Sequence, residues 1–191
     1  MSEKADRVRI EYMPLDKLQE APRNPKLHSV EDIKDSMRRF GFVQVPAINE
    51  TTGRLVAGHG RREALIEMKT AGEPAPKRIV VKGSKWLVPV LRGVAFDTDQ
   101  EAEAYLLADN RLSDIGGYDE AVLAQALADL QKVTDGLKGT GYSEADLKEL
   151  IGKQSDSGTE SPGEFPGFNE STETAYRCPS CYYEWNGSPK P

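Results

Sequence analysis

Two glycines and two arginines lie close together between Leu55 and Ala64, in the run Leu-Val-Ala-Gly-His-Gly-Arg-Arg-Glu-Ala. The pattern predicts a strand that ends near Gly58 and a helix that begins a few residues later. Backbone N–H groups at a helix N-terminus point toward one position and carry the positive end of the helix dipole, which suits a phosphate group. Arg61 and Arg62 would add charge-assisted hydrogen bonds to phosphate oxygens. The alternative is a tight turn with two solvated arginines.

A second group of reactive side chains lies near the C-terminus, where two residues separate Cys178 from Cys181. In a reducing compartment this spacing indicates a zinc half-site or a redox pair rather than a structural disulfide. Structural zinc takes four ligands, and a Cys-x-x-Cys knuckle supplies half of them. The sequence therefore predicts a Zn²⁺ ion shared between two chains or completed by a partner, with a decayed knuckle as the alternative.

The elements that must position the glycines and arginines follow from the hydrophobic pattern. Apolar residues recur every three or four positions from Val30 to Phe40, which predicts a helix over residues 29–40 with Ser29 at its N-cap. Gly53 lies where a hairpin turn needs a positive φ angle. The other elements expected in this half are strands over 8–13, 45–49, 54–57, 78–81 and 86–95 and a helix over 61–69.

The second half of the chain is predicted to be mainly helical. Helices are expected over 99–112, 119–133 and 143–151, with Asp119 and Ser143 as N-cap residues. Residues 152–173 are rich in Ser, Gly, Glu and Pro, which is typical of a flexible acidic linker. The predicted fold class is α+β. Its parts are a main domain over 7–115, a helical extension over 116–151, the acidic linker, and a short Cys-x-x-Cys tail over 174–191.

Charge is divided unevenly along the 191 residues, whose formal net charge is −6. Residues 1–92 hold 18 Lys and Arg against 12 Asp and Glu, a net charge of +6, whereas residues 93–191 hold 7 against 19, a net charge of −12. The acidic average limits affinity for DNA, but the basic half can meet phosphate groups. No apolar run is long enough for a membrane span or a signal peptide, so we expect a soluble, cytoplasmic protein without a membrane partner.

The order of the motifs in the first half resembles that of a known family. Four segments carry the resemblance: Arg23-Asn24-Pro25, the helix over 29–40, the run Gly-Phe-Val-Gln-Val-Pro at 41–46, and the run Ala-Gly-His-Gly-Arg-Arg-Glu-Ala at 57–64. Together they are similar to the N-terminal domain of ParB proteins, which shares its fold with sulfiredoxin. The resemblance covers about residues 7–115 and implies a ParB/sulfiredoxin-like fold. The run at 108–120 resembles the short ParB-domain proteins of phages and prophages, some of which lie beside DNA methyltransferases.

The resemblance implies a nucleotide site. In ParB proteins a Gly-Glu-Arg-Arg loop cradles the triphosphate of CTP, and a later Glu-Asn-x-x-Arg helix supplies magnesium and phosphate contacts. Here the loop corresponds to residues 58–61, and a shortened Asp-Asn-Arg motif at 109–111 corresponds to the helix. The implied nucleotide-binding residues are Gly58, His59, Gly60, Arg61, Arg62, Gln44, Arg23, Asn24, Asn110 and Arg111. The implied Mg²⁺ ligands are Asp109 and Asn110.

His59 and Asp109 are the candidate catalytic residues that follow from this resemblance. His59 stands where sulfiredoxin has its nucleophilic cysteine, and no cysteine precedes Cys178, so sulfiredoxin activity is not expected. Three roles remain open for His59: a general base, a phosphate donor in its imidazolium form, or a loop residue without chemistry.

The preferred prediction is a protein that binds CTP or ATP with Mg²⁺, hydrolyses it slowly if at all, and acts in DNA transactions of a bacterium or phage. The alternatives are a DNA nuclease of the ParB-like type and a non-catalytic adaptor that recruits a DNA methyltransferase or another partner. Non-specific DNA binding by the basic half and assembly as a homodimer are further expectations. The basic residues singled out for DNA are Arg38, Arg39, Lys82, Lys85 and Arg92. The sequence does not determine which nucleotide is bound, whether it is hydrolysed, or whether DNA is cut or only bound.

Overall fold

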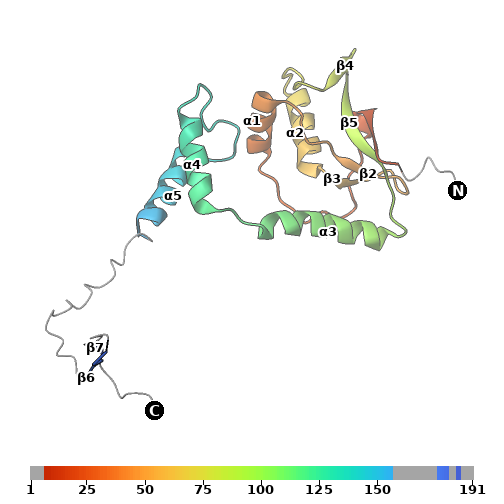
Figure 1. Ribbon diagram of the computed structural model, residues 1–191. Helices are drawn as coiled ribbons and strands as arrows, with labels where there is room; N and C mark the ends of the chain where they lie inside the picture. The colour runs from red at the N-terminus through yellow and green to blue at the C-terminus, as the bar shows by residue number, and fades with distance from the viewer. Residues whose placement is uncertain (1–6, 157–175, 181–183, 186–191) are drawn as a thin grey trace. The chain divides into compact units, whose positions relative to one another are not determined.

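The structure is a computed structural model that describes residues 7–156, 176–180 and 184–185. The chain divides into two compact units, Met1–Gln154 and Ser155–Pro191. The sheet of the first unit contains β1 (Arg9–Pro14), β2 (Ala47–Asn49), β3 (Leu55–Ala57), β4 (Val80–Lys82) and β5 (Lys85–Val94). Its strand order is β1-β5-β2-β3, and β4 pairs with β5 outside this path (Figure 1).

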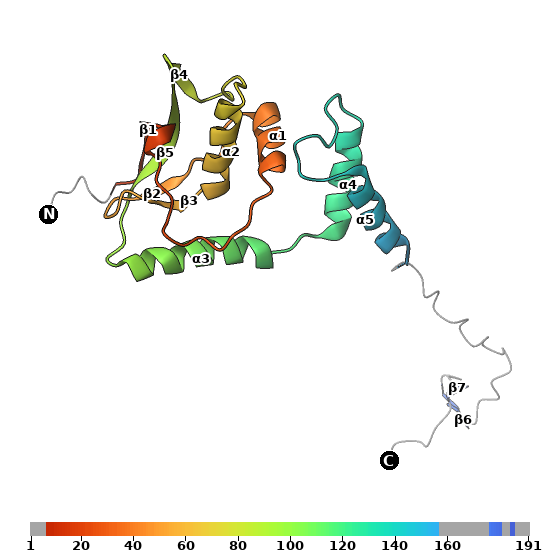
Figure 2. The same cartoon turned by 180° about the vertical axis from the view of Figure 1, so that it is seen from behind.

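Two of the helices, α1 (Val30–Phe40) and α2 (His59–Thr70), cover one face of this sheet (Figures 1 and 2). Within the described residues the other helices are the short 3-10 helix η1 (Leu15–Lys17), α3 (Asp99–Ile115), α4 (Glu120–Gln131) and α5 (Glu144–Asp156). Both views show α1 and α2 side by side on the same side of the sheet (Figures 1 and 2). α3 contacts the edge strand β3. This arrangement confirms the predicted α+β fold class.

β5 is the strand that organises the sheet. It is antiparallel to β1 and β4 and parallel to β2. Leu91 donates its N–H to the carbonyl oxygen of Pro46 at 2.8 Å, and residues two apart in a strand direct their N–H groups to the same edge. Pro89, which has no N–H, therefore falls between the part of that edge that pairs with β4 and the part that pairs with β2. A proline is tolerated there because no ladder hydrogen bond is lost.

The main hydrophobic core lies between the sheet and the two helices α1 and α2. Its largest fully buried members include Phe42, Leu18, Ile48, Leu55, Leu65 and Met68. Leu65 on α2 has no exposed surface. Truncation of such a leucine to alanine typically costs about 2–5 kcal/mol because a cavity remains. Packing of α2 against the sheet therefore fixes the position of its N-terminus in space.

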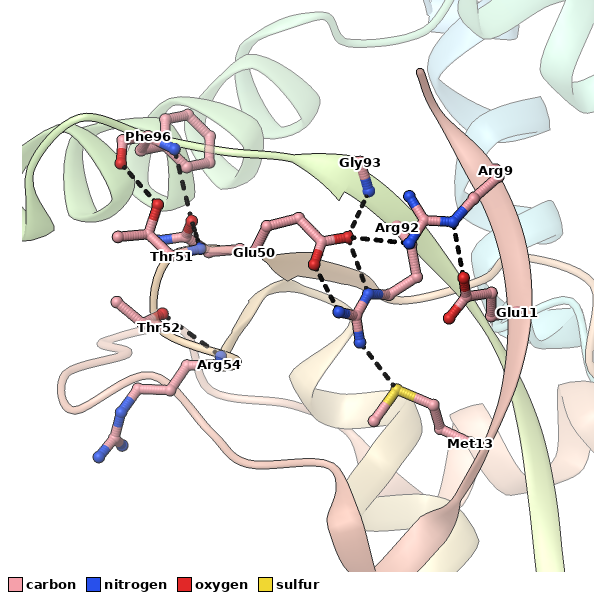
Figure 3. A network of polar contacts seen from close by, with 11 residues as sticks. Arg9, Glu11, Met13, Glu50, Thr51, Thr52, Arg54, Arg92, Gly93 and Phe96 are labelled. Atoms are coloured by element: carbon pink, nitrogen blue, oxygen red, sulfur yellow. Dashed lines mark hydrogen bonds and ion pairs between the residues drawn. The ribbon is translucent and has the colours of Figure 1, made fainter. Parts of the chain in front are cut away.

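A half-buried carboxylate holds the turn after β2. Glu50 accepts hydrogen bonds from the Nε of Arg92 at 2.9 Å and from the backbone N–H of Gly93 at 2.6 Å (Figure 3). The Arg92 guanidinium is the main reason why the pKa of Glu50 falls to about 2. Arg92 also lies 3.3 Å from the sulfur of Met13. The network joins β1, β5 and the β2–β3 turn at one end of the sheet.

The helical extension has a small core of its own. Its buried members are Ala124, Leu127, Leu137 and Leu147. The Asp119 carboxylate accepts hydrogen bonds from two N–H groups in the first turn of α4, both at 3.1 Å. At α5 the Ser143 hydroxyl accepts from the N–H of Asp146 at 3.2 Å, and the Asp146 carboxylate accepts from the N–H of Ser143 at 2.6 Å. Both predicted N-caps are confirmed.

The extension is attached to α1 through backbone contacts. The Arg39 guanidinium donates to the carbonyl oxygens of Gly136 at 2.9 Å and Lys138 at 2.5 Å. Gly139 has a φ of +72°, and a Cβ atom there would lie only 2.8 Å from the carbonyl oxygen of Asp35. This close approach between a glycine and α1 lets the loop between α4 and α5 pack on the main domain.

Several element boundaries differ from those expected. α2 begins at His59 rather than Arg61, and α5 continues to Asp156, so residues 152–156 of the predicted linker are helical. Ser29 occupies the N-cap position of α1, but its hydroxyl donates to the Asp32 carboxylate at 2.5 Å and accepts no backbone N–H. The rest of the predicted linker lies outside the described residues.

The tail contains two short strands within its described residues. β6 (Tyr176–Arg177) pairs in an antiparallel manner with β7 (Glu184–Trp185). Cys181 lies outside the described residues. Among the helices that the structure describes, none combines the length and the apolar composition needed to cross a membrane.

Candidate functional site

A cleft of about 290 Å³ opens beside the N-terminus of α2. The loop before α1, the turn between β3 and α2, and one face of α3 line it. Most of the residues predicted from sequence meet there: Asn24, Gln44, Gly58, His59, Gly60, Arg61, Asp109 and Asn110. The topology thus gathers residues that are up to 86 positions apart in the chain.

Two glycines are needed for the shape of the cleft. Gly58 is the N-cap of α2 with a φ of +89°, and a Cβ atom there would lie 2.7 Å from the Cβ of Pro46. Gly60 has an ordinary backbone angle, but its Cβ would lie 2.6 Å from the Cγ of His28. A side chain at either position would force its neighbour to move. Glycine therefore allows the first turn of α2 to approach the loop before α1.

The first turn of α2 presents backbone donors to the cleft. The earliest hydrogen bond at this end runs from the N–H of Arg62 to the carbonyl oxygen of Gly58 at 3.1 Å. The N–H groups of His59, Gly60 and Arg61 come before it, at the end of the helix where N–H groups have no intrahelical acceptor. Together with the helix dipole, they make this position favourable for an anion.

Arg61 brings a side-chain cation to the same place. Its guanidinium donates a hydrogen bond to the Oε1 atom of Gln44, which fixes the direction of the planar group. Burial lowers the pKa of Arg61, whereas the nearby Asp109 carboxylate raises it. An arginine stays protonated at neutral pH in either case. The guanidinium therefore provides a lasting positive charge between Gln44 and Asp109.

Two further residues of the cleft, Lys26 and His28, were not predicted as part of it. The Lys26 ammonium contacts both carboxylate oxygens of Asp114, at 2.6 and 2.7 Å. The Asn24 side chain orders this loop, since its Oδ1 accepts the N–H of Lys26 at 3.2 Å and its Nδ2 lies 3.4 Å from the Nε2 of His28. The sequence signal that could have identified Lys26 and His28 was their position within four residues of Asn24, in the basic half of the chain.

α3 supplies the oxygen-bearing side of the cleft through Asp109, Asn110 and Ser113. The Nδ2 of Asn110 donates to the carbonyl oxygen of Leu106 at 3.0 Å. This hydrogen bond leaves the Oδ1 of Asn110 as the amide atom suited to a cation. The Ser113 hydroxyl donates to the carbonyl oxygen of Asp109, also at 3.0 Å. Ser113, unlike Asp109 and Asn110, was not predicted from the sequence.

Arg62 lies outside the cleft, contrary to expectation. Its Nε donates to the carbonyl oxygen of Leu18 at 2.6 Å, and its Nη1 lies 2.7 Å from the Glu20 carboxylate. Successive residues of a helix are rotated by about 100°, so Arg61 and Arg62 cannot both face the same ligand. Arg62 fastens the segment after η1 to α2.

Arg23 and Arg111 also lie apart from the cleft. Arg23 forms an ion pair with Glu103 at 2.5 Å and lines a different cavity, of about 300 Å³, between α3 and the edge strand β3. Arg111 is exposed on α3, two positions after Asp109 and thus about 200° around the helix from it. The shortened Asp-Asn-Arg motif therefore turns its arginine away from the site.

His59 has a structural contact that its predicted catalytic roles did not anticipate. Its Nε2 accepts a hydrogen bond from the backbone N–H of Ala21 at 3.2 Å, and the side chain is buried. Burial is the main cause that lowers the pKa of His59. An imidazole that accepts at Nε2 is neutral, with its proton on Nδ1. The structure thus opposes both the imidazolium role and a general base that acts through Nε2.

The predicted zinc half-site is described only in part. Cys178 is half-buried in the turn after β6, whereas Cys181 is outside the described residues. No group of three or more His, Cys, Asp or Glu side chains within the described ranges is placed to hold a metal ion. Zinc at this knuckle stays a prediction. Metal analysis of the purified protein, with its molecular size measured before and after chelation, tests it.

The chain folds into an α+β domain in which the N-terminus of α2 faces a charged cleft. No protein-family model matches the chain. The ParB-like nuclease domain-containing protein YnaK of Escherichia coli (strain K12) is 34% identical to it over 82 residues, which are 41% of this chain and 90% of that protein. The chain therefore belongs to the ParB-like nuclease domain family.

A solved structure is also similar to this chain. It is the crystal structure of the C-terminally truncated chromosome-partitioning protein ParB from Caulobacter crescentus, complexed with CTP-gamma-S. The likeness covers 75% of this chain and 71% of that one, with 19% sequence identity and a TM-score of 0.45.

Proposed function

We propose that the cleft beside α2 binds the phosphates of a nucleoside triphosphate, CTP or ATP. One observation carries this proposal: the first N–H groups of α2 line the same cleft as the cations Lys26 and Arg61. Phosphate oxygens accept hydrogen bonds from both kinds of donor. The planar guanidinium of Arg61 can donate to two phosphate oxygens at once. The volume of about 290 Å³ is close to the lower end of the range for small-molecule sites, about 300–1,000 Å³.

The charges of the cleft suggest how a triphosphate would enter. Lys26, which lines the cleft, is paired with Asp114, so an anionic ligand would compete with this carboxylate for the ammonium group. The phosphates would exchange places with this carboxylate, while Arg61 would keep the orientation that Gln44 gives it. Gln44 would then lie beside the nucleoside. Because the ion pair is exposed, its exchange costs little, as exposed pairs contribute about 0–1 kcal/mol.

Asp109 and Asn110 fit a Mg²⁺ ion that accompanies the phosphates. Mg²⁺ prefers hard oxygen ligands and is commonly held by one or two carboxylates together with phosphate groups. The Asp109 carboxylate and the Asn110 Oδ1 are such oxygens on the α3 side of the cleft. When bound, the ion would neutralise part of the charge that the triphosphate brings.

Calorimetric titration with CTP, ATP and GTP, each with Mg²⁺, tests the site. We expect one nucleotide to bind below millimolar concentration and Arg61→Ala to weaken it at least tenfold. Arg111→Ala removes an exposed arginine outside the cleft and serves as the matched control, with affinity unchanged. If no nucleotide binds, or if both variants behave like the parent protein, the non-catalytic adaptor becomes the better account.

Slow hydrolysis of the nucleotide is the proposed activity of this site. His59 is left out because its Nε2 is engaged by Ala21. Asp109 remains the catalytic candidate, since its carboxylate lines the cleft on the side where Mg²⁺ and a water molecule would meet the phosphates. Release of inorganic phosphate from the bound nucleotide, compared between the parent and Asp109→Asn, measures this activity.

A nuclease is the second candidate, and the printed name of the Escherichia coli relative favours it. Action on or beside DNA is common to both candidates. The test is incubation of the purified protein with supercoiled and linear DNA and either Mg²⁺ or Mn²⁺. Nicking that is lost in Asp109→Asn would support a nuclease at the same cleft, whereas intact DNA with both metals would exclude this candidate.

A further inference from the structure

The face of the sheet opposite α1 and α2 carries an apolar strip. Side chains alternate between the two faces of a strand, so buried Val88 and Val90 of β5 point toward the helices and Leu87 and Leu91 point the other way. In the antiparallel register Ile10 of β1 is opposite Leu91. Residues directly opposite each other share a face. This outer face therefore includes Ile10 and Leu91.

The same register extends the strip along β1 and β4. Tyr12 is opposite Pro89, and Leu87 is opposite both Pro14 in β1 and Val80 in β4. Ile10 is 60% exposed, Tyr12 50% and Val80 38%. In both views α1 and α2 lie on the other side of the sheet (Figures 1 and 2). A contiguous exposed apolar surface of this kind on a folded protein marks an interaction site.

Two lysines extend the outer face at the tip of the β4–β5 hairpin. Lys82 and Lys85 are register partners, and their positions two residues beyond Val80 and Leu87 place them on the same face as these apolar residues. Both side chains are exposed. Like charges directly opposite each other destabilise a sheet. A bound anion would relieve the repulsion between these two ammonium groups.

The remaining basic residues singled out for DNA are engaged in contacts within the fold. Arg38 contacts Glu73 at 2.7 Å, Arg92 contacts Glu50, and Arg39 donates to two backbone carbonyls. The side-chain ammonium groups of Lys82 and Lys85, by contrast, form no hydrogen bond or ion pair with any described residue. Of the five, these two lysines are therefore the ones whose charge is available to a phosphate backbone.

Tyr12 supplies an aromatic ring at the centre of this surface. Its hydroxyl lies 3.5 Å from the carbonyl oxygen of Arg78, which favours one orientation of the ring. Arg78 is a non-glycine residue with a φ of +75°, so this backbone position is itself strained. Exposed aromatic rings on antiparallel sheets bind single-stranded nucleic acids by stacking on their bases, and nearby cations hold the phosphates.

We propose that this outer face, formed by Ile10, Tyr12, Val80, Leu87 and Leu91 with Lys82 and Lys85 at its end, binds single-stranded DNA. The combination of positive charge and apolar surface favours single-stranded over duplex DNA. Duplex DNA would offer phosphates to the two lysines but no base face to Tyr12 and its apolar neighbours. Single-stranded DNA satisfies both parts, because its unstacked bases cover the strip while its phosphates reach the lysines.

Fluorescence anisotropy with a labelled oligo(dT) strand, compared with a duplex of the same length, tests this inference on the full chain at low salt. We expect the single strand to bind more tightly than the duplex. Tyr12→Ala should weaken binding about tenfold, whereas Tyr12→Phe, which keeps the ring, should bind as the parent does. The combined change Lys82→Gln and Lys85→Gln should weaken binding and lower the salt dependence by about 1.4 in log–log slope.

Two matched controls separate this surface from the rest of the molecule. Tyr118→Ala removes a tyrosine that is 74% exposed outside the sheet and should leave DNA binding unchanged. Arg111→Ala removes an exposed arginine of α3 that lies outside the cleft, and it should also leave DNA binding unchanged. Nucleotide is absent from these measurements, so failure of the nucleotide site and failure of this proposal can be told apart. Equal or tighter binding of the duplex, or a parent-like affinity in the double lysine variant, would overturn the proposal. Absence of binding to the single strand would do the same.

Discussion

The imidazole of His59 and the backbone of Ala21 are joined by a hydrogen bond in which the Nε2 atom accepts the N–H at 3.2 Å. The contact ties the first residue of α2 to the segment that precedes the Asn24 loop. It explains why a histidine in the middle of a predicted phosphate loop is buried rather than directed at a ligand. His59 thus shapes the cleft while Arg61 and Lys26 supply its charge.

We predict that the pKa of His59 lies below its ordinary value of 6.5, because burial of the imidazole lowers it. Between 6.5 and the lower folded pKa, the unfolded chain binds more protons than the folded one. The free energy of unfolding should therefore fall as the pH drops below 6.5, and His59→Gln, which keeps an acceptor for Ala21, should reduce this fall. NMR titration of the imidazole measures the pKa, and His28→Gln assigns the two histidines. A midpoint at or above 6.5 would refute the account.

Glu50 should govern stability in acid. Its pKa of about 2 lies below the ordinary 4.5, so the stabilisation is complete above 4.5 and is lost as the pH falls from 4.5 toward 2. Glu50→Gln should lower the free energy of unfolding by about 1–3 kcal/mol at neutral pH, because a charge-assisted contact to Arg92 is lost. Urea unfolding measures this. Glu11→Gln, at an exposed ion pair with Arg9, is the control and should cost less than about 1 kcal/mol.

Gly60→Ala should close the cleft without unfolding the domain. The new Cβ would lie 2.6 Å from the Cγ of His28 and 2.9 Å from the Cδ1 of Ile33, so the imidazole of His28, which lines the cleft, must move. We expect nucleotide affinity to fall at least tenfold while the circular dichroism spectrum keeps its helical signal. Gly152→Ala, where nothing lies within 4 Å of the new atom, should leave affinity intact. Full affinity in Gly60→Ala would show that the phosphates bind elsewhere.

Arg39→Ala should loosen the helical extension. The variant loses both hydrogen bonds to the carbonyls of Gly136 and Lys138, which attach the α4–α5 loop to α1. Hydrogen exchange should become faster in α4 and α5, with little change in the sheet, because the extension has its own small core. Arg111→Ala removes an exposed arginine and should leave the exchange pattern unaltered. Equal protection of α4 and α5 in Arg39→Ala would contradict the proposed role of these contacts.

The fold was predictable where one segment carries its own signal. The amphipathic spacing from Val30 to Phe40 indicated α1, and the side chains of Asp119 and Ser143 marked the starts of α4 and α5. Boundaries were less accurate where tertiary contacts decide. α2 begins at His59 because Gly58 can adopt a positive φ against Pro46, and neither contact is visible in the pattern of apolar residues.

The candidate site was predictable in its loop and less so around it. Gly58, Gly60 and Arg61 follow one another in the chain, so a local motif was enough to predict them. Lys26 enters the cleft because the loop before α1 packs beside α2, which no local pattern reveals. Arg62 was predicted to bind phosphate because it follows Arg61 in the sequence. Successive residues of a helix point in different directions, so Arg62 faces away from the cleft.

Backbone amide NMR during a titration with Mg²⁺ and CTP or ATP tests the central claim most directly. If the phosphates bind at the N-terminus of α2, the largest shifts should fall on the N–H groups of His59, Gly60 and Arg61. Smaller changes should reach Asp109 and Asn110 on α3, and Arg61→Ala should abolish the response below millimolar nucleotide. Shifts confined to other parts of the chain, or no shift up to millimolar concentration, would contradict the account.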